Sequence, residues 1–315
     1  MRAVAVDQLK GEPRLVELPT PTPKPDQLLV RVSVAGMNPF DWKLADGALA
    51  GVMPNVLPFV LGLDAAGVVA AVGSAVSRFS DGARVFGQFF HVPLGEGTYA
   101  EYALVPKTGA VALLPTGIDD AVGAALPTAG MTALAMVDAL GLAAGSTVLI
   151  NGATGGVGCF ATQLAAARGY RVLATAGASD APLLRGFGAA EIYEYRTVDL
   201  FTSVQQAHPQ GIDALLDLVS DAPTLKRMVG LVRRGGQVRS TIGAADTGML
   251  QQRGLQGGNF FLKAEASLLR RLAAIVESGE LQVPIDSTIA LDSVPAAIAA
   301  HRRGSARGKT VIRIT

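Results

Sequence analysis

The stretch STVLINGATGGVGCFATQLAAARG, residues 146–169, runs from a β-branched apolar segment through a glycine-rich turn into an alanine-rich segment. This order predicts a strand, a tight turn and a helix. Gly155, Gly156 and Gly158 would let the backbone pass close to a pyrophosphate, whose charge then meets the N–H groups and dipole of the helix start. Ala153 stands where the first glycine of G-x-G-x-x-G is expected. The strand before the turn and the helix after it still indicate a dinucleotide-binding loop.

The alternation of this stretch continues on both sides of it, from about residue 119 onward. Apolar runs predict strands at 147–151, 171–175, 191–193, 214–218 and 236–241. Helices fit between them at 157–168, 181–187 and 222–231. Strands and helices that alternate at this spacing predict a doubly wound parallel sheet with helices on both faces, the Rossmann arrangement.

The residues before this region have a different sequence pattern. Short β-rich runs at 28–34, 66–72, 84–86 and 99–105 are bounded by proline and glycine turns. A helix at 263–278 and short β segments that end at 310–314 follow the nucleotide region. The predicted class is therefore α/β. A β-rich domain of residues 1–120 and 258–315 carries an inserted dinucleotide-binding domain of residues 121–257.

Composition narrows the class of protein. The 315 residues carry a formal net charge of +1 with dispersed Lys and Arg, which argues against nucleic acid and a membrane surface as partners. The uncharged run 121–137 is at the lower limit for a membrane span and contains Pro127, so it predicts a buried helix preceded by a turn. A single cysteine excludes an intramolecular disulfide framework. Without an apolar core behind its first Arg, the N-terminus does not resemble a signal peptide, and a cytoplasmic protein is expected.

The end of the second nucleotide-domain strand indicates which dinucleotide is bound. NAD-binding proteins place Asp or Glu there to accept a hydrogen bond from the ribose 2′-OH, and that carboxylate repels a 2′-phosphate. Here the strand ends in Thr175, Ala176 and Gly177, and Asp180 lies several residues into the loop. The missing acid favours NADPH as the cofactor.

Five motifs in order resemble the quinone oxidoreductase (zeta-crystallin-like) branch of the medium-chain dehydrogenase/reductase superfamily. They are AGMNPFDWKLADG, LPFVLGLDAAGVV, GTYAEY, INGATGGVG and the closing ARGKTVIRI, so the resemblance covers essentially the whole chain. It implies a GroES-like β domain next to a Rossmann domain, with the active site in the cleft between them. It also implies a small quinone or enone substrate and a homodimer.

The resemblance also allows the positions of the superfamily's zinc ligands to be compared with this sequence. Zinc alcohol dehydrogenases of this superfamily use an early Cys and the His of a Gly-His-Glu segment, where this chain has Asn38 and Leu63. The four-cysteine structural zinc lobe is absent, and the sole cysteine, Cys159, lies in the phosphate-binding helix. A tetrahedral zinc site needs three or four Cys, His or carboxylate ligands. We therefore expect no metal.

Matching the family's cofactor positions to this sequence gives a set of expected NADPH contacts. In the phosphate loop they are Thr154, Gly155, Gly156 and Val157. Around the 2′-phosphate they are Gly177, Ser179, Tyr195 and Arg196, because the Lys common after the glycine is missing here. Along the nicotinamide and near the C-terminus they are Ser240, Thr241, Ile242, Gly243, Asn259, and Arg307 or Lys309.

For catalysis the sequence offers hydrogen-bond donors. A hydride delivered to a quinone or a conjugated C=C leaves a delocalised negative charge that donors can stabilise without a metal. The candidates are Asn38, whose amide can donate, and Thr128, whose hydroxyl the resemblance places toward the cleft; Asp41 could hold the loop. Asn38 before Pro39 is also a common turn former, and Asp41 and Thr128 could be helix caps. His91 is the best placed of the three histidines.

Two other functions remain open from the sequence. One is an enoyl or 2-haloacrylate-type reductase, although residues 43–60 contain no Tyr to act as a proton donor and no pocket Arg is evident. The other is a non-catalytic NADPH-binding protein with a structural or regulatory role. The physiological substrate and the proton donor cannot be read from the sequence.

Overall fold

The computed structural model describes residues 1–304 and 307–314, and the chain divides into two compact units. Unit 1 comprises Met1–Met131 and Ala264–Thr315, and unit 2 comprises Thr132–Lys263. The expected fold class, a GroES-like β-rich part with an inserted Rossmann sheet, is confirmed. The units divide about ten residues after the predicted first boundary because helix α2 (Asp120–Ala125) packs on strands of unit 1.

Unit 1 is built on two sheets. A four-stranded sheet has the order β2-β1-β4-β7, and a seven-stranded sheet has the order β16-β17-β3-β5-β6-β9 with β8 paired to β3. The strands are β1 (Arg2–Val6), β2 (Arg14–Glu17), β3 (Gln27–Gly36), β4 (Asn55–Val60), β5 (Asp64–Val72), β6 (Arg84–Gln88), β7 (Leu94–Glu96), β8 (Tyr102–Pro106), β9 (Ala110–Leu113), β16 (Ile285–Ala290) and β17 (Lys309–Arg313). The C-terminal β17 pairs with β3 on one side and β16 on the other, so the end of the chain completes this sheet.

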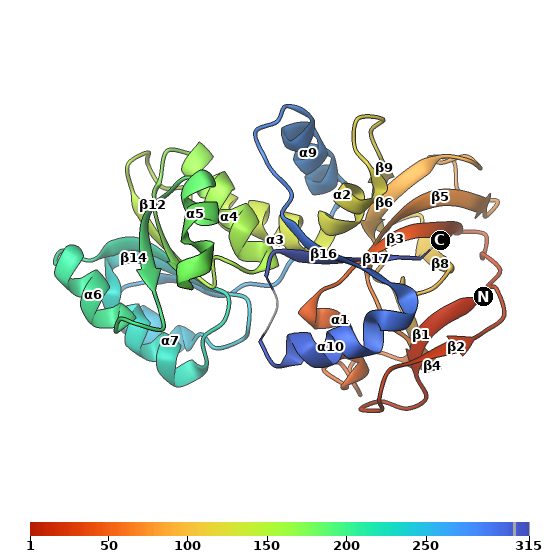
Figure 1. Ribbon diagram of the computed structural model, residues 1–315, viewed down its shortest axis with the longest axis horizontal. Coiled ribbons are helices and arrows are strands. Elements are labelled where there is room, and N and C mark those ends of the chain that lie inside the picture. Colours follow the sequence, from red (N-terminus) through yellow and green to blue (C-terminus); the bar gives the residue numbers. More distant parts are fainter. Residues whose placement is uncertain (305–306, 315) are drawn as a thin grey trace. The chain divides into compact units, whose positions relative to one another are not determined.

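Helices lie around these sheets, and Figure 1 shows two of them, α1 and α10, side by side. The helices of unit 1 are α1 (Pro39–Ala45), α2, α9 (Ala266–Glu277) and α10 (Val294–Arg302), together with the start of α3 (Pro127–Asp138). The sequence does not predict α1 in this β-rich region. This helix begins because Pro39 supplies a fixed φ at its first position and Asp41 accepts a hydrogen bond from the backbone N–H of Asn38.

The uncharged run 121–137, predicted as a buried helix preceded by a turn, forms two helices. Asp119 caps α2 by accepting from the N–H of Val122, and Pro127 starts α3 after Leu126 ends α2. No helix in the described ranges 1–304 and 307–314 is long and apolar enough to cross a membrane.

Unit 2 has one six-stranded parallel sheet of order β12-β11-β10-β13-β14-β15. Its strands are β10 (Thr147–Asn151), β11 (Arg171–Ala176), β12 (Ala189–Glu194), β13 (Ile212–Asp217), β14 (Val232–Ser240) and β15 (Gln256–Asn259). This is the doubly wound order in which the direction of winding reverses beside the first strand, here β10. The last three residues of β10 before Asn151 are fully buried, as expected for a parallel strand covered on both faces.

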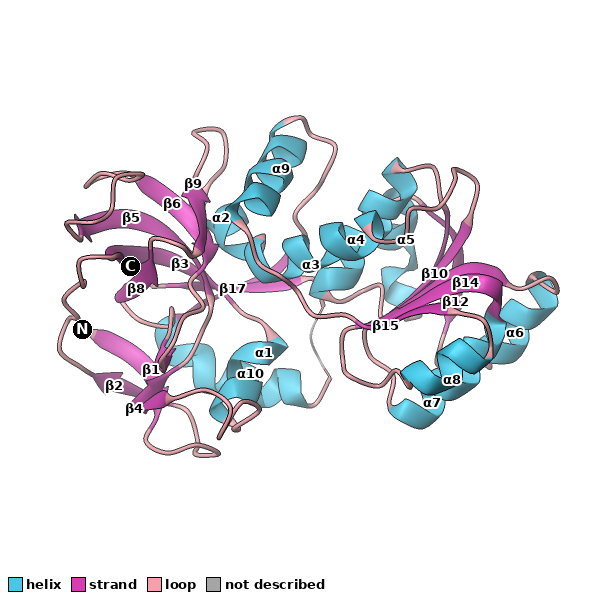
Figure 2. Ribbon diagram, turned by 180° about the vertical axis from the view of Figure 1, so that it is seen from behind, coloured by secondary structure: helices cyan, strands magenta, loops and turns pink. Residues whose placement is uncertain are grey.

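Helices cover both faces of this sheet, as the sequence predicted. They are α4 (Gly156–Ala167), α5 (Ala181–Gly186), α6 (Leu200–Ala207), α7 (Ala222–Met228) and α8 (Thr247–Gln252). Figure 2 shows α4 and α5 on one face and α6, α7 and α8 on the other. Asp199, Asp221 and Asp246 start the last three by accepting backbone hydrogen bonds at their N-termini.

Candidate active site

Five polar residues that lie far apart in the sequence meet inside unit 1 and form a buried polar cluster. Asn38 caps α1, and Asp41 lies in its first turn. Asp64 opens β5, Thr128 is in the first turn of α3, and Lys309 opens β17. Except for the half-buried Thr128, all are at most 4% exposed. The structure thus brings together the three predicted catalytic residues with one residue expected at the cofactor and one that was not singled out.

The Asn38 amide lies between opposite charges. Its Oδ1 accepts a hydrogen bond of 2.6 Å from Lys309 Nζ, and its Nδ2 donates to Asp64 Oδ2 at 2.8 Å. Lys309 Nζ also donates to the carbonyl oxygen of Met37 at 2.8 Å. An ammonium on the oxygen and a carboxylate on the nitrogen fix the orientation of the amide. An ammonium on the oxygen also polarises the amide toward stronger donation by its N–H groups.

Asp64 is the acceptor around which this arrangement is built. It accepts from the backbone N–H of Thr128 at 2.9 Å and from the Thr128 hydroxyl at 2.6 Å, and that hydroxyl accepts from Gln88 Nε2 at 2.7 Å. Burial raises the pKa of Asp64, and the charge of Lys309 opposes that rise. Burial likewise lowers the pKa of Lys309, while Asp64 and Asp41 oppose the fall. Each charge therefore depends on the other for its stability inside unit 1.

Asp41 has a different environment from Asp64. Its Oδ2 accepts from the Tyr99 hydroxyl at 2.6 Å and from the backbone N–H of Asn38 at 2.7 Å. Its Oδ1 is buried and has no hydrogen-bond partner among the described residues. Burial raises the pKa of Asp41 to about 7, the Tyr99 hydrogen bond opposes this rise, and the charge of Asp64 adds to it. Burial thus makes Asp41 easier to protonate than an exposed aspartate.

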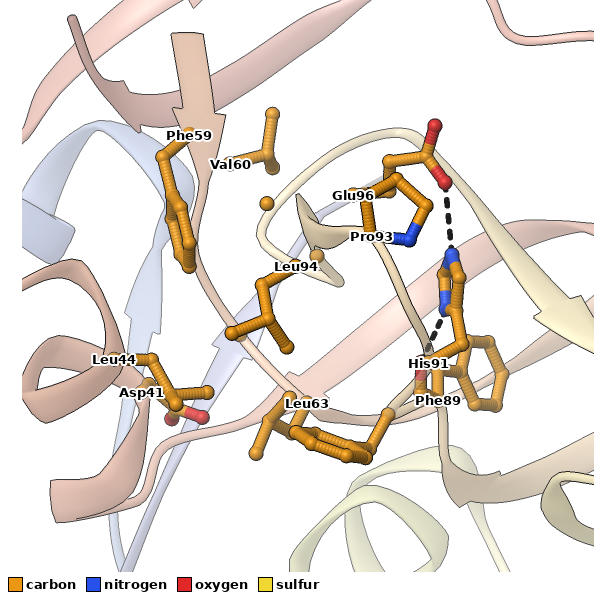
Figure 3. Close-up of a pocket in the computed structure, with 14 residues that line it drawn as sticks. Asp41, Leu44, Phe59, Val60, Leu63, Phe89, His91, Pro93, Leu94 and Glu96 are labelled. Carbon is orange, nitrogen blue, oxygen red and sulfur yellow. Dashed lines mark hydrogen bonds and ion pairs between the residues drawn. The ribbon is translucent and has the colours of Figure 1, made fainter. Parts of the chain in front are cut away.

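A small cavity borders Asp41. Figure 3 shows Asp41 and Leu44 at one end of it and the His91–Glu96 pair at the other. His91 Nε2 lies 2.8 Å from Glu96 Oε2, and His91 Nδ1 lies 2.8 Å from the carbonyl oxygen of Phe89. The space that water can occupy is about 20 Å³, room for about one molecule. His91 therefore belongs to a hydrogen-bonded pair with Glu96 that borders this cavity.

The predicted phosphate loop lies between β10 and α4 in unit 2. Thr154 and Gly155 precede the helix, and Gly156 and Val157 open it. A Cβ on Gly158 would overlap the carbonyl oxygen of Gly152, so only glycine allows the helix to pack this closely on the loop. At Gly155 the nearest described atom would be 3.5 Å from a Cβ, which leaves the loop open. The loop fits a pyrophosphate.

Polar side chains beneath the loop connect the ends of four strands in a hydrogen-bond network that the sequence does not predict. Thr175 accepts from the backbone N–H of Gly152 at 2.9 Å and donates to Asn151 Oδ1 at 3.1 Å. Asn151 Nδ2 donates to Asp217 Oδ1 at 3.0 Å, and Ser240 donates to Asp217 Oδ2 at 3.2 Å. The strand-terminal positions of these residues were the signal that could have revealed the network, because parallel strands end at one edge.

Several of the residues expected along the nicotinamide form hydrogen bonds within the protein. Ser240 is fully buried on Asp217, and Ile242 donates its backbone N–H to the Ser240 hydroxyl at 3.4 Å. Thr241 donates its backbone N–H to the carbonyl oxygen of Asp217, and Gly243 follows with a φ of +78°. Asn259 binds both the N–H and the carbonyl oxygen of Ala245 through its side chain. It therefore shapes the loop after β14.

The residues expected at the 2′-phosphate gather at the ends of β11 and β12. Gly177 follows β11, and Ser179 lies in the turn after it. Tyr195 follows β12 and donates its backbone N–H to the carbonyl oxygen of Ala176 at 3.3 Å. The Arg196 guanidinium lies 5.7 Å from the centre of the Tyr195 ring. These four positions share one edge of the sheet in unit 2.

The two C-terminal bases have different settings. Arg307 is exposed, whereas Lys309 is 2% exposed and binds Met37 and Asn38. The structure thus places Lys309 in the buried polar cluster of unit 1. In the described parts of the chain, no group of three or more His, Cys, Asp or Glu is arranged to hold a metal ion. Leu63 and Cys159 are both buried.

Comparisons with known proteins agree with one another. A sequence profile described as "Alcohol dehydrogenase GroES-like domain" matches residues 24–116, and one described as "Zinc-binding dehydrogenase" matches residues 187–312. The chain is 33% identical to the quinone oxidoreductase of Pongo abelii over 99% of its own length and 97% of that protein. It is 32% identical to the 2-methylene-furan-3-one reductase of Solanum lycopersicum over 98% of its own length and 76% of that protein.

Two further proteins are similar to this chain in sequence or in structure. The chain is 39% identical to a chloroplastic quinone-oxidoreductase homolog of Spinacia oleracea over 188 residues, which are 58% of this chain and 56% of that protein. The solved structure of the quinone oxidoreductase from Coxiella burnetii superposes with a TM-score of 0.88 at 28% identity, covering 100% of this chain and 99% of that one.

Proposed function

This chain belongs to the quinone oxidoreductase branch of the medium-chain dehydrogenase/reductase superfamily and is an oxidoreductase, and we propose that it transfers hydride from NADPH to a quinone or an α,β-unsaturated carbonyl without zinc. The names of its relatives support both substrate classes. The Pongo and Coxiella proteins are quinone oxidoreductases. The Solanum protein is a 2-methylene-furan-3-one reductase, and a ketone with an adjacent methylene double bond is an enone.

The observation that carries the proposal is the hydrogen-bonded chain Lys309–Asn38–Asp64. Zinc dehydrogenases of this superfamily resemble this chain but have metal ligands where Asn38 and Leu63 stand. Neither an amide nor a leucine fits a tetrahedral zinc site. Instead, a buried ammonium 2.6 Å from Asn38 Oδ1 polarises the amide. A polarised amide donor of this kind stabilises the enolate or hydroquinone anion that hydride transfer leaves.

The remaining residues of the cluster position Asn38. Asp64 accepts one Asn38 N–H and the Thr128 hydroxyl, so Thr128 acts on the amide through Asp64. Asp41 accepts the backbone N–H of Asn38 and fixes the start of α1. We propose that Asn38 is the catalytic donor and that Asp41 and Thr128 are positioning residues.

The cofactor would be held by unit 2. The open loop at Thr154, Gly155, Gly156 and Val157 fits the pyrophosphate, and Arg196 offers a cation at the end of β12. When bound, the reduced nicotinamide supplies the hydride, and the protein supplies orientation and exclusion of water.

The test is steady-state oxidation of NADPH and NADH with ortho- and para-quinones and simple enones as acceptors. The protein is first dialysed against a zinc chelator, and its residual zinc is measured. Turnover at undiminished rate with a quinone or enone supports the proposal. Loss of activity that zinc restores overturns the zinc-free part of it. Dinucleotide binding with no reduction of any acceptor favours a binding protein instead, and turnover restricted to enoyl thioesters or 2-haloacrylate favours that class of reductase.

A further inference from the structure

We propose that Asp180 is a specificity-determining residue that lowers the affinity of this chain for the 2′-phosphate of NADPH and allows NADH to bind at a comparable level. This inference rests on the proposed function, because it concerns the dinucleotide site of that function. It also changes the expectation from the sequence, in which Asp180 lies too far into the loop to reach the ribose.

The backbone brings Asp180 back to the strand end. Strand β11 ends at Ala176, and a short 3₁₀ turn covers Ala178–Asp180. The N–H of Asp180 donates to the carbonyl oxygen of Gly177 at 3.0 Å and closes this turn. A Cβ on Gly177 would lie 3.6 Å from Asp180 Oδ2, ordinary van der Waals contact. A carboxylate therefore lies against the glycine that follows the second strand, where NAD-binding proteins hold the ribose 2′-OH.

A cation lies at the end of the neighbouring strand. In the register of the parallel pair, Ala176 of β11 is opposite Glu194 of β12. The bond from Tyr195 N–H to the carbonyl oxygen of Ala176 keeps the next residues at the same edge. Arg196 follows directly, with its guanidinium near the Tyr195 ring. Within residues 1–304 and 307–314, Arg196 forms no ion pair with a carboxylate.

The two side chains have opposite preferences. A carboxylate accepts a hydrogen bond from a ribose 2′-OH and repels a phosphate dianion, whereas a guanidinium attracts the phosphate. Asp180 thus favours NADH, and Arg196 favours NADPH. Because both lie at the edge formed by β11 and β12, the dinucleotide preference is set by their balance, and removing either charge shifts it in a known direction.

The experiment measures binding in the absence of turnover. Dissociation constants of NADPH and NADH are determined by fluorescence titration, and those of 2′,5′-ADP and 5′-AMP by calorimetry, for the wild type, Asp180→Asn and Arg196→Gln. Asp180→Glu retains the charge, and Asp81→Asn removes an exposed carboxylate of unit 1. Thermal unfolding checks that each variant is folded.

We expect Asp180→Asn to raise the affinity for NADPH and 2′,5′-ADP about ten-fold while NADH binding weakens a few-fold. Arg196→Gln should lower the affinity for NADPH about ten-fold and leave NADH nearly unchanged. Asp81→Asn should change neither. An unchanged NADPH to NADH ratio in Asp180→Asn overturns the inference but leaves the proposed function standing. A wild type that binds neither dinucleotide overturns both.

Discussion

Replacement of Asp41 by asparagine is expected to stabilise unit 1 above neutral pH, although it removes a buried, hydrogen-bonded carboxylate. The amide oxygen can accept from the Tyr99 hydroxyl and the Asn38 N–H as Asp41 Oδ2 does. The amide nitrogen would take the place of Oδ1, which has no partner among the described residues. The side chain that Asp41→Asn introduces is therefore close in shape and charge to the protonated form of Asp41.

The magnitude follows from the pKa of Asp41, which burial raises from 3.8 to about 7. Because the folded-state pKa lies above the unfolded value, the native state binds more protons between about pH 4 and 7, and stability is lost as the pH rises through that window. A difference of about three pH units corresponds to about 4 kcal/mol. At pH 5 the variant should be more stable than the wild type by less than about 2 kcal/mol, and by pH 8 the gain should reach up to about 4 kcal/mol.

The assay is guanidinium unfolding at pH 5 and pH 8, followed by tryptophan fluorescence. Trp42 is the single tryptophan of the chain and lies in α1 beside Asp41, so it reports the unfolding of unit 1. Asp81→Asn, at an exposed carboxylate, controls for the change in net charge. The reasoning is refuted if Asp41→Asn is less stable than the wild type at pH 8 or if the difference between them does not change with pH.

Three further outcomes are expected. Gly158→Ala should weaken NADPH binding more than about ten-fold in a fluorescence titration, because its Cβ would overlap the Gly152 carbonyl oxygen, whereas Gly186→Ala, with no described atom within 4 Å, should not. Lys309→Met should lower the free energy of unfolding by about 3–5 kcal/mol at pH 7, measured by Trp42 fluorescence, because Asp64 and Asp41 lose their buried cation; a change below about 1 kcal/mol would contradict the charged cluster. Tyr99→Phe should move the stability transition of Asp41 to higher pH, since the lost hydrogen bond opposes the rise in its pKa, and a shift to lower pH would count against that assignment.

Local pattern was enough to predict most of unit 2. The loop 152–158 and the strands beside it could be predicted because period, glycine spacing and helix start all coincide within one short stretch. In unit 1 the sequence did not predict α1, because Asn38-Pro39 is as typical of a turn as of a helix start. Pro127, inside the run 121–137, separates α2 from α3, where the sequence predicted a turn followed by a buried helix.

The site was predictable only in part because its contacts span the chain. Asn38 and Lys309 are 271 positions apart, and Tyr99 and Asp41 are 58 apart. Nothing in the local sequence shows that β17 enters the sheet beside β3 and carries Lys309 into the core. The resemblance implies a cofactor contact for Lys309, and because lysines are usually exposed, its buried position is not expected from the sequence. The proximity of Asp180 to Gly177 is not evident from the sequence for a similar reason, because it depends on a turn that sequence distance does not reveal.

The most direct test of the central claim compares metal-depleted wild type with Asn38→Ala in the NADPH-dependent reduction of a para-quinone, with NADPH binding measured in parallel. We predict that the wild type keeps its activity after chelation. We also predict that Asn38→Ala loses about 10²-fold in kcat with an unchanged dissociation constant for NADPH, because it removes a donor that acts on the developing anion. Equal kcat values in the two proteins, or a wild type that turns over only with zinc, would contradict the account.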